Sequence, residues 1–91
     1  MNKRRFVEII DGKHNIVGKN IRKLREKQDF SRQYVSDQLM IRGIDVSPQS
    51  ILDIESGTRT VVDYELCAIA NVLNTTSDEL MKEFNDYLKK F

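Results

Sequence analysis

The sequence predicts an all-helical domain, because apolar residues recur at helical spacing in several stretches and residues typical of helix starts and ends bound them. Of the 91 residues, 27 are leucine, isoleucine, valine or phenylalanine, which is well above the composition of a disordered segment. A chain of this length can build one hydrophobic core. We therefore expect a single domain that folds without a cofactor.

The N-terminal part of the chain begins with a short apolar stretch. Residues 6–10, FVEII, are typical of an extended segment that ends in a turn at Asp11-Gly12, and a helical turn is the alternative. These apolar side chains must be buried, and we expect the C-terminal tail to pack against them.

A helix is predicted to begin after Ser31, which is a typical N-cap residue. Val35 and Leu39 follow at a spacing of four, so one apolar stripe of this helix faces the core. The helix therefore has one buried side.

The next helix is predicted to follow Ser47, a capping hydroxyl, with Pro48 at the first helical position. Ile51 and Ile54 face inward, and Gly57 is placed to take the left-handed conformation that ends a helix. A helix of about ten residues needs tertiary packing. Its outer face holds Gln49, Ser50 and Asp53, and the Gln49 amide can both donate to and accept from an adenine edge.

The C-terminal tail is predicted to form one amphipathic helix that starts at Thr76 or Ser77. Its apolar residues recur at spacings of three and four, and they are Leu80, Met81, Phe84, Tyr87, Leu88 and Phe91. This stripe is either a homodimer contact or a surface that packs within the chain, against the N-terminal segment and the first helix.

The order and spacing of five patterns resemble the helix-turn-helix domain of the phage repressor and Cro type, also called the xenobiotic-response-element class. The resemblance covers residues 17–81. Its patterns are Ile21-Arg22-x-Leu24-Arg25, Phe30-Ser31, Val46-Ser47, Ile51-x-x-Ile54-Glu55-x-Gly57-x-Arg59, and Leu66-x-x-Ile69-Ala70-x-x-Leu73 followed by Ser77-x-Glu79-Leu80.

The resemblance implies a five-helix repressor-like domain over residues 16–81, with a short N-terminal extension at 1–15 and an extended C-terminal helix at 82–91. The third helix would lie in the major groove. The residues implied to meet base edges are Ser47, Pro48, Gln49, Ser50 and Asp53. Those implied to hold phosphates are Lys19, Lys23, Arg32, Thr58 and Arg59. Arg25 and Glu55 match a structural pair that joins the first and third helices.

The sequence departs from the family pattern at three places. The link between Leu39 and Val46 is about five residues longer than the family minimum, so either the second helix runs on to Arg42 or a wider turn forms. Asp53 stands where a basic or amide residue is frequent, and near phosphates its carboxylate is repelled unless it accepts from a cytosine amino group. Val61 replaces a frequent proline.

The charge of the chain is unevenly distributed. Its net charge is +1, but residues 1–27 hold nine basic and three acidic side chains, a net +6. The other 64 residues hold six basic and eleven acidic side chains, a net −5. Such asymmetry suits a single DNA-facing side. A solvated basic face without a partner is the alternative.

The sequence gives little support for a catalytic or metal-binding site. His14 lies in a polar loop, and Cys67 shares the inward pattern of the fourth helix, so we expect a surface histidine and a buried, inert thiol. No metal-site spacing exists, and we expect neither a metal nor enzymatic activity.

The sequence has no apolar run of about eighteen residues, and residues 1–5 are not followed by the apolar core of a signal peptide. Its one cysteine fits a reducing compartment. We expect a cytoplasmic protein without membrane contact.

The sequence thus predicts a sequence-specific, double-stranded DNA-binding transcription regulator, a repressor that acts as a homodimer. One alternative is a protein-interaction module of the same fold, such as an antitoxin or an anti-repressor partner. A second is a purely structural dimer with a degenerate reading helix.

Overall fold

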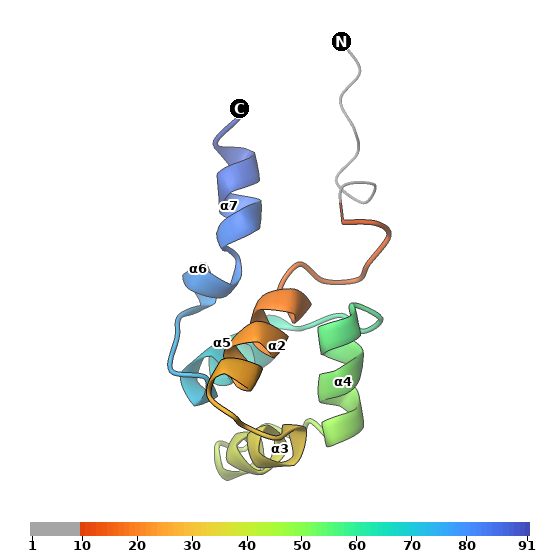
Figure 1. Ribbon diagram of the computed structural model, residues 1–91, viewed down its shortest axis with the longest axis vertical. Coiled ribbons are helices and arrows are strands. Elements are labelled where there is room, and N and C mark those ends of the chain that lie inside the picture. The colour runs from red at the N-terminus through yellow and green to blue at the C-terminus, as the bar shows by residue number, and fades with distance from the viewer. Residues whose placement is uncertain (1–9) are drawn as a thin grey trace.

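The computed structural model describes residues 10–91, and the elements in this part of the chain are α-helices. They are α2 (Gly18–Lys27), α3 (Arg32–Ile41), α4 (Pro48–Ser56), α5 (Asp63–Val72), α6 (Ser77–Leu80) and α7 (Lys82–Leu88). No strand occurs among the described residues, which confirms the all-α prediction. The extended segment predicted at residues 6–10 lies, except for Ile10, outside the described residues. In Figure 1, α2 to α6 form a helical body and α7 extends from it along the longest axis.

The helix ends predicted around α3 and α4 are present. The Ser31 hydroxyl accepts a hydrogen bond from the Tyr34 N–H at 2.9 Å, and the Ser47 hydroxyl accepts one from the Ser50 N–H at 3.1 Å. Each bond satisfies a backbone donor that has no partner within its helix. Gly57 ends α4 with φ = 82°, in the left-handed region that costs glycine little.

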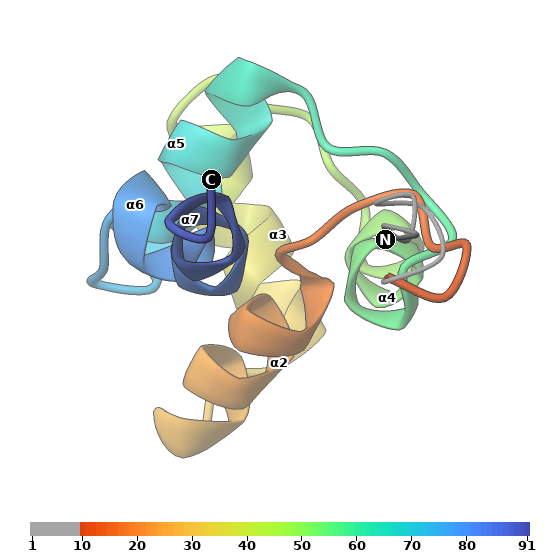
Figure 2. The ribbon, with the colours of Figure 1, turned by 90° about the horizontal axis from the view of Figure 1, so that it is seen from above.

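One core joins the helices. Helix α4 packs against α2 and α3, and α3 packs against α5. Ile51 and Ile54 are 1% and 0% exposed, so α4 is anchored by two side chains that each contribute about 1.5–3 kcal/mol on burial. The other buried apolar residues are Val17, Ile21, Val35, Leu39, Val46, Ile69, Ala70, Val72, Leu73 and Leu80. Seen from above in Figure 2, α4 lies on the side of the molecule opposite to α6.

The long link before α4 forms partly by extension of α3, in which Met40 and Ile41 are helical, and residues 42–45 lie outside the helix. This helix ends at Ile41 with Arg42 as its C-cap, which agrees with the first of the two predicted alternatives. The Ile44 N–H returns to the Leu39 carbonyl at 2.9 Å. The Arg42 Nε donates to the Asn71 Oδ1 of α5 at 2.8 Å, which ties the link to the helical body. Ile41 is left 75% exposed.

The tail is not the single helix that the apolar spacing predicts, because it forms two helices, α6 and α7. Helices α2 to α6 are the five predicted over residues 16–81. Met81 separates α6 from α7. The Asn20 Nδ2 of α2 donates to the Leu80 carbonyl at 3.0 Å and to the Glu83 Oε2 at 2.7 Å. The two bonds from α2 therefore meet the tail at the point where it divides into two helices.

The predicted apolar stripe of the tail divides at the same point. Leu80 is 0% exposed and belongs to the core, whereas Leu88 and Phe91 are 48% and 69% exposed. The rings of Phe84, Tyr87 and Phe91 follow one another at centroid distances of 6.0 and 5.5 Å. Intramolecular packing therefore accounts for the start of the stripe.

Candidate nucleic-acid interface

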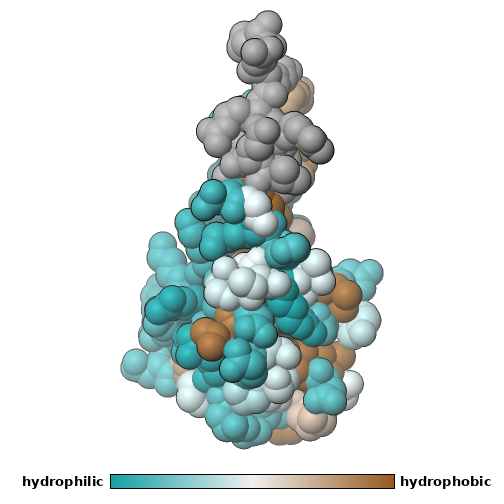
Figure 3. All heavy atoms as spheres, turned by 90° about the vertical axis from the view of Figure 1, so that its right-hand side faces the viewer, coloured by the Kyte–Doolittle hydropathy of each residue, from teal (hydrophilic) through white to brown (hydrophobic). Residues whose placement is uncertain are grey.

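The outer face of α4 is polar and accessible. Gln49, Leu52 and Ser56 are exposed, and Ser50 and Asp53 are half-buried. Figure 3 views the molecule from the side on which α4 lies, and the residues on that face are mainly hydrophilic. Residues 48–56 contain no lysine or arginine. The helix can therefore meet base edges with neutral and acidic groups, while cations must come from its neighbours.

Ser47 and Pro48 start this helix. The Ser47 hydroxyl accepts from the Ser50 N–H and donates to the Ser50 Oγ at 3.1 Å. Pro48 is half-buried at the first helical position, where it needs no hydrogen-bond donor. Both residues lie at the N-terminal end of the predicted reading face, and Ser47 has a structural role there as well.

Gln49 and Asp53 form a hydrogen-bonded pair on the outer face. The Gln49 Nε2 donates to the Asp53 Oδ1 at 3.1 Å, one helical turn away. This bond uses one of two amide hydrogens. The Gln49 Oε1 and the second Asp53 oxygen both remain acceptors, so the pair presents more acceptors than donors.

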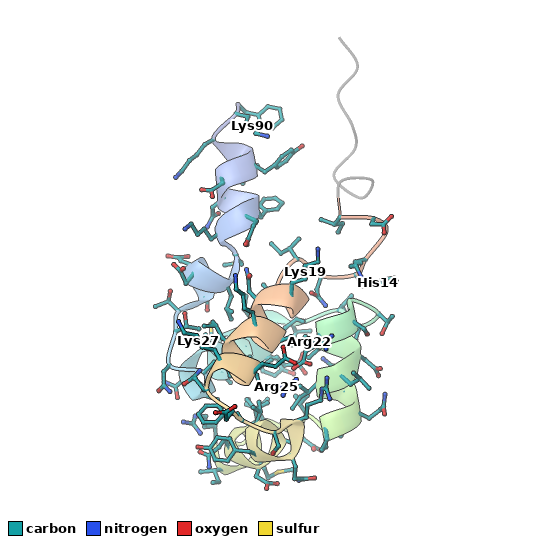
Figure 4. The ribbon with its side chains drawn as sticks, viewed as in Figure 1. His14, Lys19, Arg22, Arg25, Lys27 and Lys90 are labelled. Carbon is teal, nitrogen blue, oxygen red and sulfur yellow. The ribbon has the colours of Figure 1, made fainter. Side chains whose placement is uncertain are left out.

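Arg25 and Glu55 form the structural ion pair that the sequence resemblance implies. The Arg25 Nε donates to the Glu55 Oε2 at 2.6 Å and the Arg25 Nη2 donates to the Glu55 Oε1 at 3.1 Å. Their side chains are 9% and 1% exposed. The hydrogen bond from Glu55 raises the pKa of Arg25 above its ordinary value. In Figure 4, Arg25 lies on α2 near α4, and Lys27 lies on the other side of α2. The bidentate pair therefore holds α4 against α2.

Arg32 was predicted to hold a phosphate, and the structure gives it a protein partner. Its Nε and Nη2 both lie 3.0 Å from the Glu55 Oε1. Glu55 thus accepts from two arginines on two different helices. The Arg32 side chain is 32% exposed, so its outer edge stays in contact with solvent.

Arg59 has a similar arrangement beyond the end of α4. Its Nη1 and Nη2 donate to the two carboxylate oxygens of Glu65, each at 3.0 Å. This bond lowers the pKa of Glu65 and raises that of Arg59. The Thr58 hydroxyl donates to the Asp53 carbonyl at 3.2 Å. The sequence reasoning missed Glu65, although its place three residues after the N-cap Val62 favours a side chain that turns back.

The two lysines predicted to hold phosphates lie on α2, apart from the reading face. Lys19 lines a cavity of about 470 Å³, and Asn20 and the α7 residues Phe84 and Tyr87 also line it. Lys23 is exposed, and within residues 10–91 it forms no ion pair. The structure therefore brings together Ser47, Pro48, Gln49, Ser50 and Asp53 on α4 and its N-cap, with Arg32 and Arg59 both near the C-terminal end of this helix.

The predicted buried thiol is wrong, because Cys67 is exposed. It follows Leu66 by one residue, a rotation of about 100° around α5, which takes it off the side defined by Ile69 and Ala70. The Ser77 hydroxyl lies 3.5 Å from its Sγ. His14 is exposed, as predicted. Among the described residues, no group of three or more histidine, cysteine or acidic side chains could hold a metal ion.

The fold and this geometry define a helix-turn-helix domain, in which α3 and α4 form the motif. A family profile described as Helix-turn-helix matches residues 21–80. The chain belongs to the phage repressor/Cro-type helix-turn-helix family, which is a family of DNA-binding proteins. Comparisons with curated proteins and with solved structures found no match. In the part of the chain that the structure describes, no helix is both long and apolar enough to cross a membrane.

Proposed function

We propose that this protein is a sequence-specific regulator that binds double-stranded DNA with α4 in the major groove and represses transcription by occupying an operator. The observation that supports this best is the outer face of α4. It presents Gln49, Ser50 and Asp53 on a short helix whose orientation is set by the doubly bonded Glu55.

The chemistry of this face favours particular bases. The Gln49–Asp53 pair offers mainly acceptors, and the major-groove donors are the amino groups of adenine and cytosine. No arginine or lysine of α4 is present to read guanine. We therefore expect operator half-sites in which adenine or cytosine amino groups face the middle of the reading helix.

Phosphates would be held near the C-terminal end of α4. Arg32 and Arg59 are ion-paired, yet 32% and 31% of their side chains are exposed, so they can approach a phosphate without leaving Glu55 and Glu65. Such contacts position the protein without reading sequence. Thr58, Lys19 and Lys23 are the further candidates.

The active form in this proposal is a homodimer. Repressors of this type read two half-sites about one helical turn of DNA apart. The exposed apolar residues Leu88 and Phe91 at the end of the chain offer a contact between two copies.

Selection of bound sites from a random double-stranded DNA pool tests the proposal. Enrichment of a two-fold symmetric motif would support DNA reading and dimerisation together, and no enriched motif would overturn the DNA-reading function. Affinity for the selected site should then fall on the order of a thousand-fold between about 50 and 200 mM salt if about six phosphates are contacted. A flat salt dependence would contradict the phosphate assignments.

One observation favours a protein-interaction module as the second candidate, such as an antitoxin or an anti-repressor partner. Helix α4 has no cation, and both nearby arginines already have carboxylate partners. A protein of this kind would enrich no DNA motif in the same selection.

A further inference from the structure

Asn15 uses its whole hydrogen-bonding capacity to join three parts of the fold. Its Oδ1 accepts from the N–H groups of Val17 at 3.1 Å and Gly18 at 2.8 Å, at the start of α2. Its Nδ2 donates to the carbonyls of Ile54 at 3.0 Å and Arg59 at 2.8 Å. A carboxamide has two donor hydrogens and an oxygen with two lone pairs, so all four are used. Asn15 precedes residues 21–80, which the family profile matches.

The backbones that Asn15 joins approach each other unusually closely. A Cβ on Gly18 would lie 2.2 Å from the Ile54 carbonyl oxygen and 3.0 Å from that of Glu55. Only glycine fits there without a shift of the backbone. The start of α2 is thus pressed against the last turn of α4.

The two residues before Asn15 bind the same end of α4. The Lys13 Nζ donates to the Ser56 carbonyl at 3.1 Å, and the His14 N–H donates to the Gly57 carbonyl at 2.8 Å. The Lys13 stem covers Gly57, because a Cβ there would lie 2.7 Å from the Lys13 Cδ. In Figure 4, His14 lies beside this end of α4. Carbonyls at the end of a helix lack partners within it, and residues 13–15 supply them.

We propose that Asn15 is a positioning residue for DNA recognition, which sets the position of the reading helix α4 relative to the loop at residues 57–62. The proposal rests on the proposed function of α4. Base contacts come from α4 and phosphate contacts from Thr58 and Arg59 in that loop, and both must meet the same DNA at once. One side chain that bonds Ile54 in the helix and Arg59 in the loop fixes their separation.

The variant Asn15→Asp separates this role from the capping of α2. An aspartate has the same shape and keeps an oxygen for the N–H groups of Val17 and Gly18, where a negative charge is favourable. Its second oxygen would face the carbonyl oxygens of Ile54 and Arg59 in place of a donor. The matched control is Asn20→Asp, which loses two similar bonds, to Leu80 and Glu83, at the tail.

Two measurements test the proposal. Amide hydrogen exchange at Gly57 and Thr58 should be about tenfold faster in Asn15→Asp than in the wild type, and unchanged in Asn20→Asp, with the most protected core amides unaffected in both. Affinity for the selected DNA site should fall about tenfold in Asn15→Asp alone, with affinity for unrelated DNA unchanged.

The outcomes are distinguishable. Equal exchange at Gly57 and Thr58 in Asn15→Asp and Asn20→Asp would overturn the positioning role, and so would faster exchange with unchanged discrimination between selected and unrelated DNA. If the wild type selects no DNA, the proposed function fails and the recognition role fails with it. The exchange measurement then still shows whether Asn15 holds the loop.

Discussion

Replacement of Glu55 by glutamine should lower the free energy of unfolding far more than the loss of a surface ion pair would. The Glu55 side chain is 1% exposed and accepts hydrogen bonds from Arg25 and Arg32. Glutamine keeps the shape but removes the charge and one acceptor. Arg25, which is 9% exposed, would then be left as a buried cation without a carboxylate, facing the Phe30 carbonyl and the one remaining amide oxygen.

The size of the effect follows from this burial. Removal of one partner of a buried ion pair costs about 3–5 kcal/mol, because the remaining charge cannot be solvated. Arg32 adds at most about 1 kcal/mol, since water reaches its guanidinium. A domain of this length has a free energy of unfolding of about 5–14 kcal/mol. The variant should therefore fold with a much smaller margin, and its Tm should fall by at least about 12 °C.

Urea unfolding followed by helical circular dichroism measures this loss, and the chain offers a matched control. Glu26 pairs with Arg22 at 3.4 Å, and these side chains are 54% and 57% exposed. Glu26→Gln should cost under about 1 kcal/mol. The double variant Arg25→Met with Glu55→Gln should recover part of the loss, because the buried charge is then absent.

Two results would refute the reasoning. If Glu55→Gln lowers the free energy of unfolding by no more than Glu26→Gln does, water solvates the Arg25–Glu55 pair. A double variant as unstable as the sum of the single variants would mean that Arg25 and Glu55 are not coupled.

Further predictions concern the reading face, the assembly and the response to acid. Gln49→Ala should relax the preference at one base position of the selected site at a cost of about 1–3 kcal/mol, and an unchanged motif would contradict its role. Leu88→Asp with Phe91→Asp should give folded monomers in sedimentation equilibrium if the tail is a dimer contact, and a retained dimer would exclude it. The bond from Arg59 lowers the Glu65 pKa below its usual 4.5, so its stabilisation is complete above that pH and is lost as the pH falls through the lowered value. Glu65→Gln should therefore lose less stability than the wild type on acid titration below pH 4.5, and parallel curves would refute this.

The sequence alone determined the features that depend on neighbours a few residues away. Ser31 and Ser47 cap their helices, and Gly57 ends α4, because each bond or dihedral angle involves the same short stretch of chain. The apolar spacing of Ile51 and Ile54 likewise placed the buried side of α4. The Arg25–Glu55 pair could be predicted because the family resemblance supplied a contact across thirty residues.

Only the tertiary structure decided which partner each long polar side chain takes. Arg32 and Arg59 are predicted to hold phosphates, and the structure gives each of them a carboxylate partner as well. The packing of α3 against α4 brings Glu55 to Arg32, and the first turn of α5 places Glu65 beside Arg59. The tail divides into α6 and α7 at the place where Asn20 on α2 binds the Leu80 carbonyl. Asn15 could be read as a local cap, but its bonds to residues 39 and 44 positions away exist only once α2 lies against α4. Spacing along the chain predicts which side of a helix is buried, whereas the crossing of two helices decides which polar atoms meet.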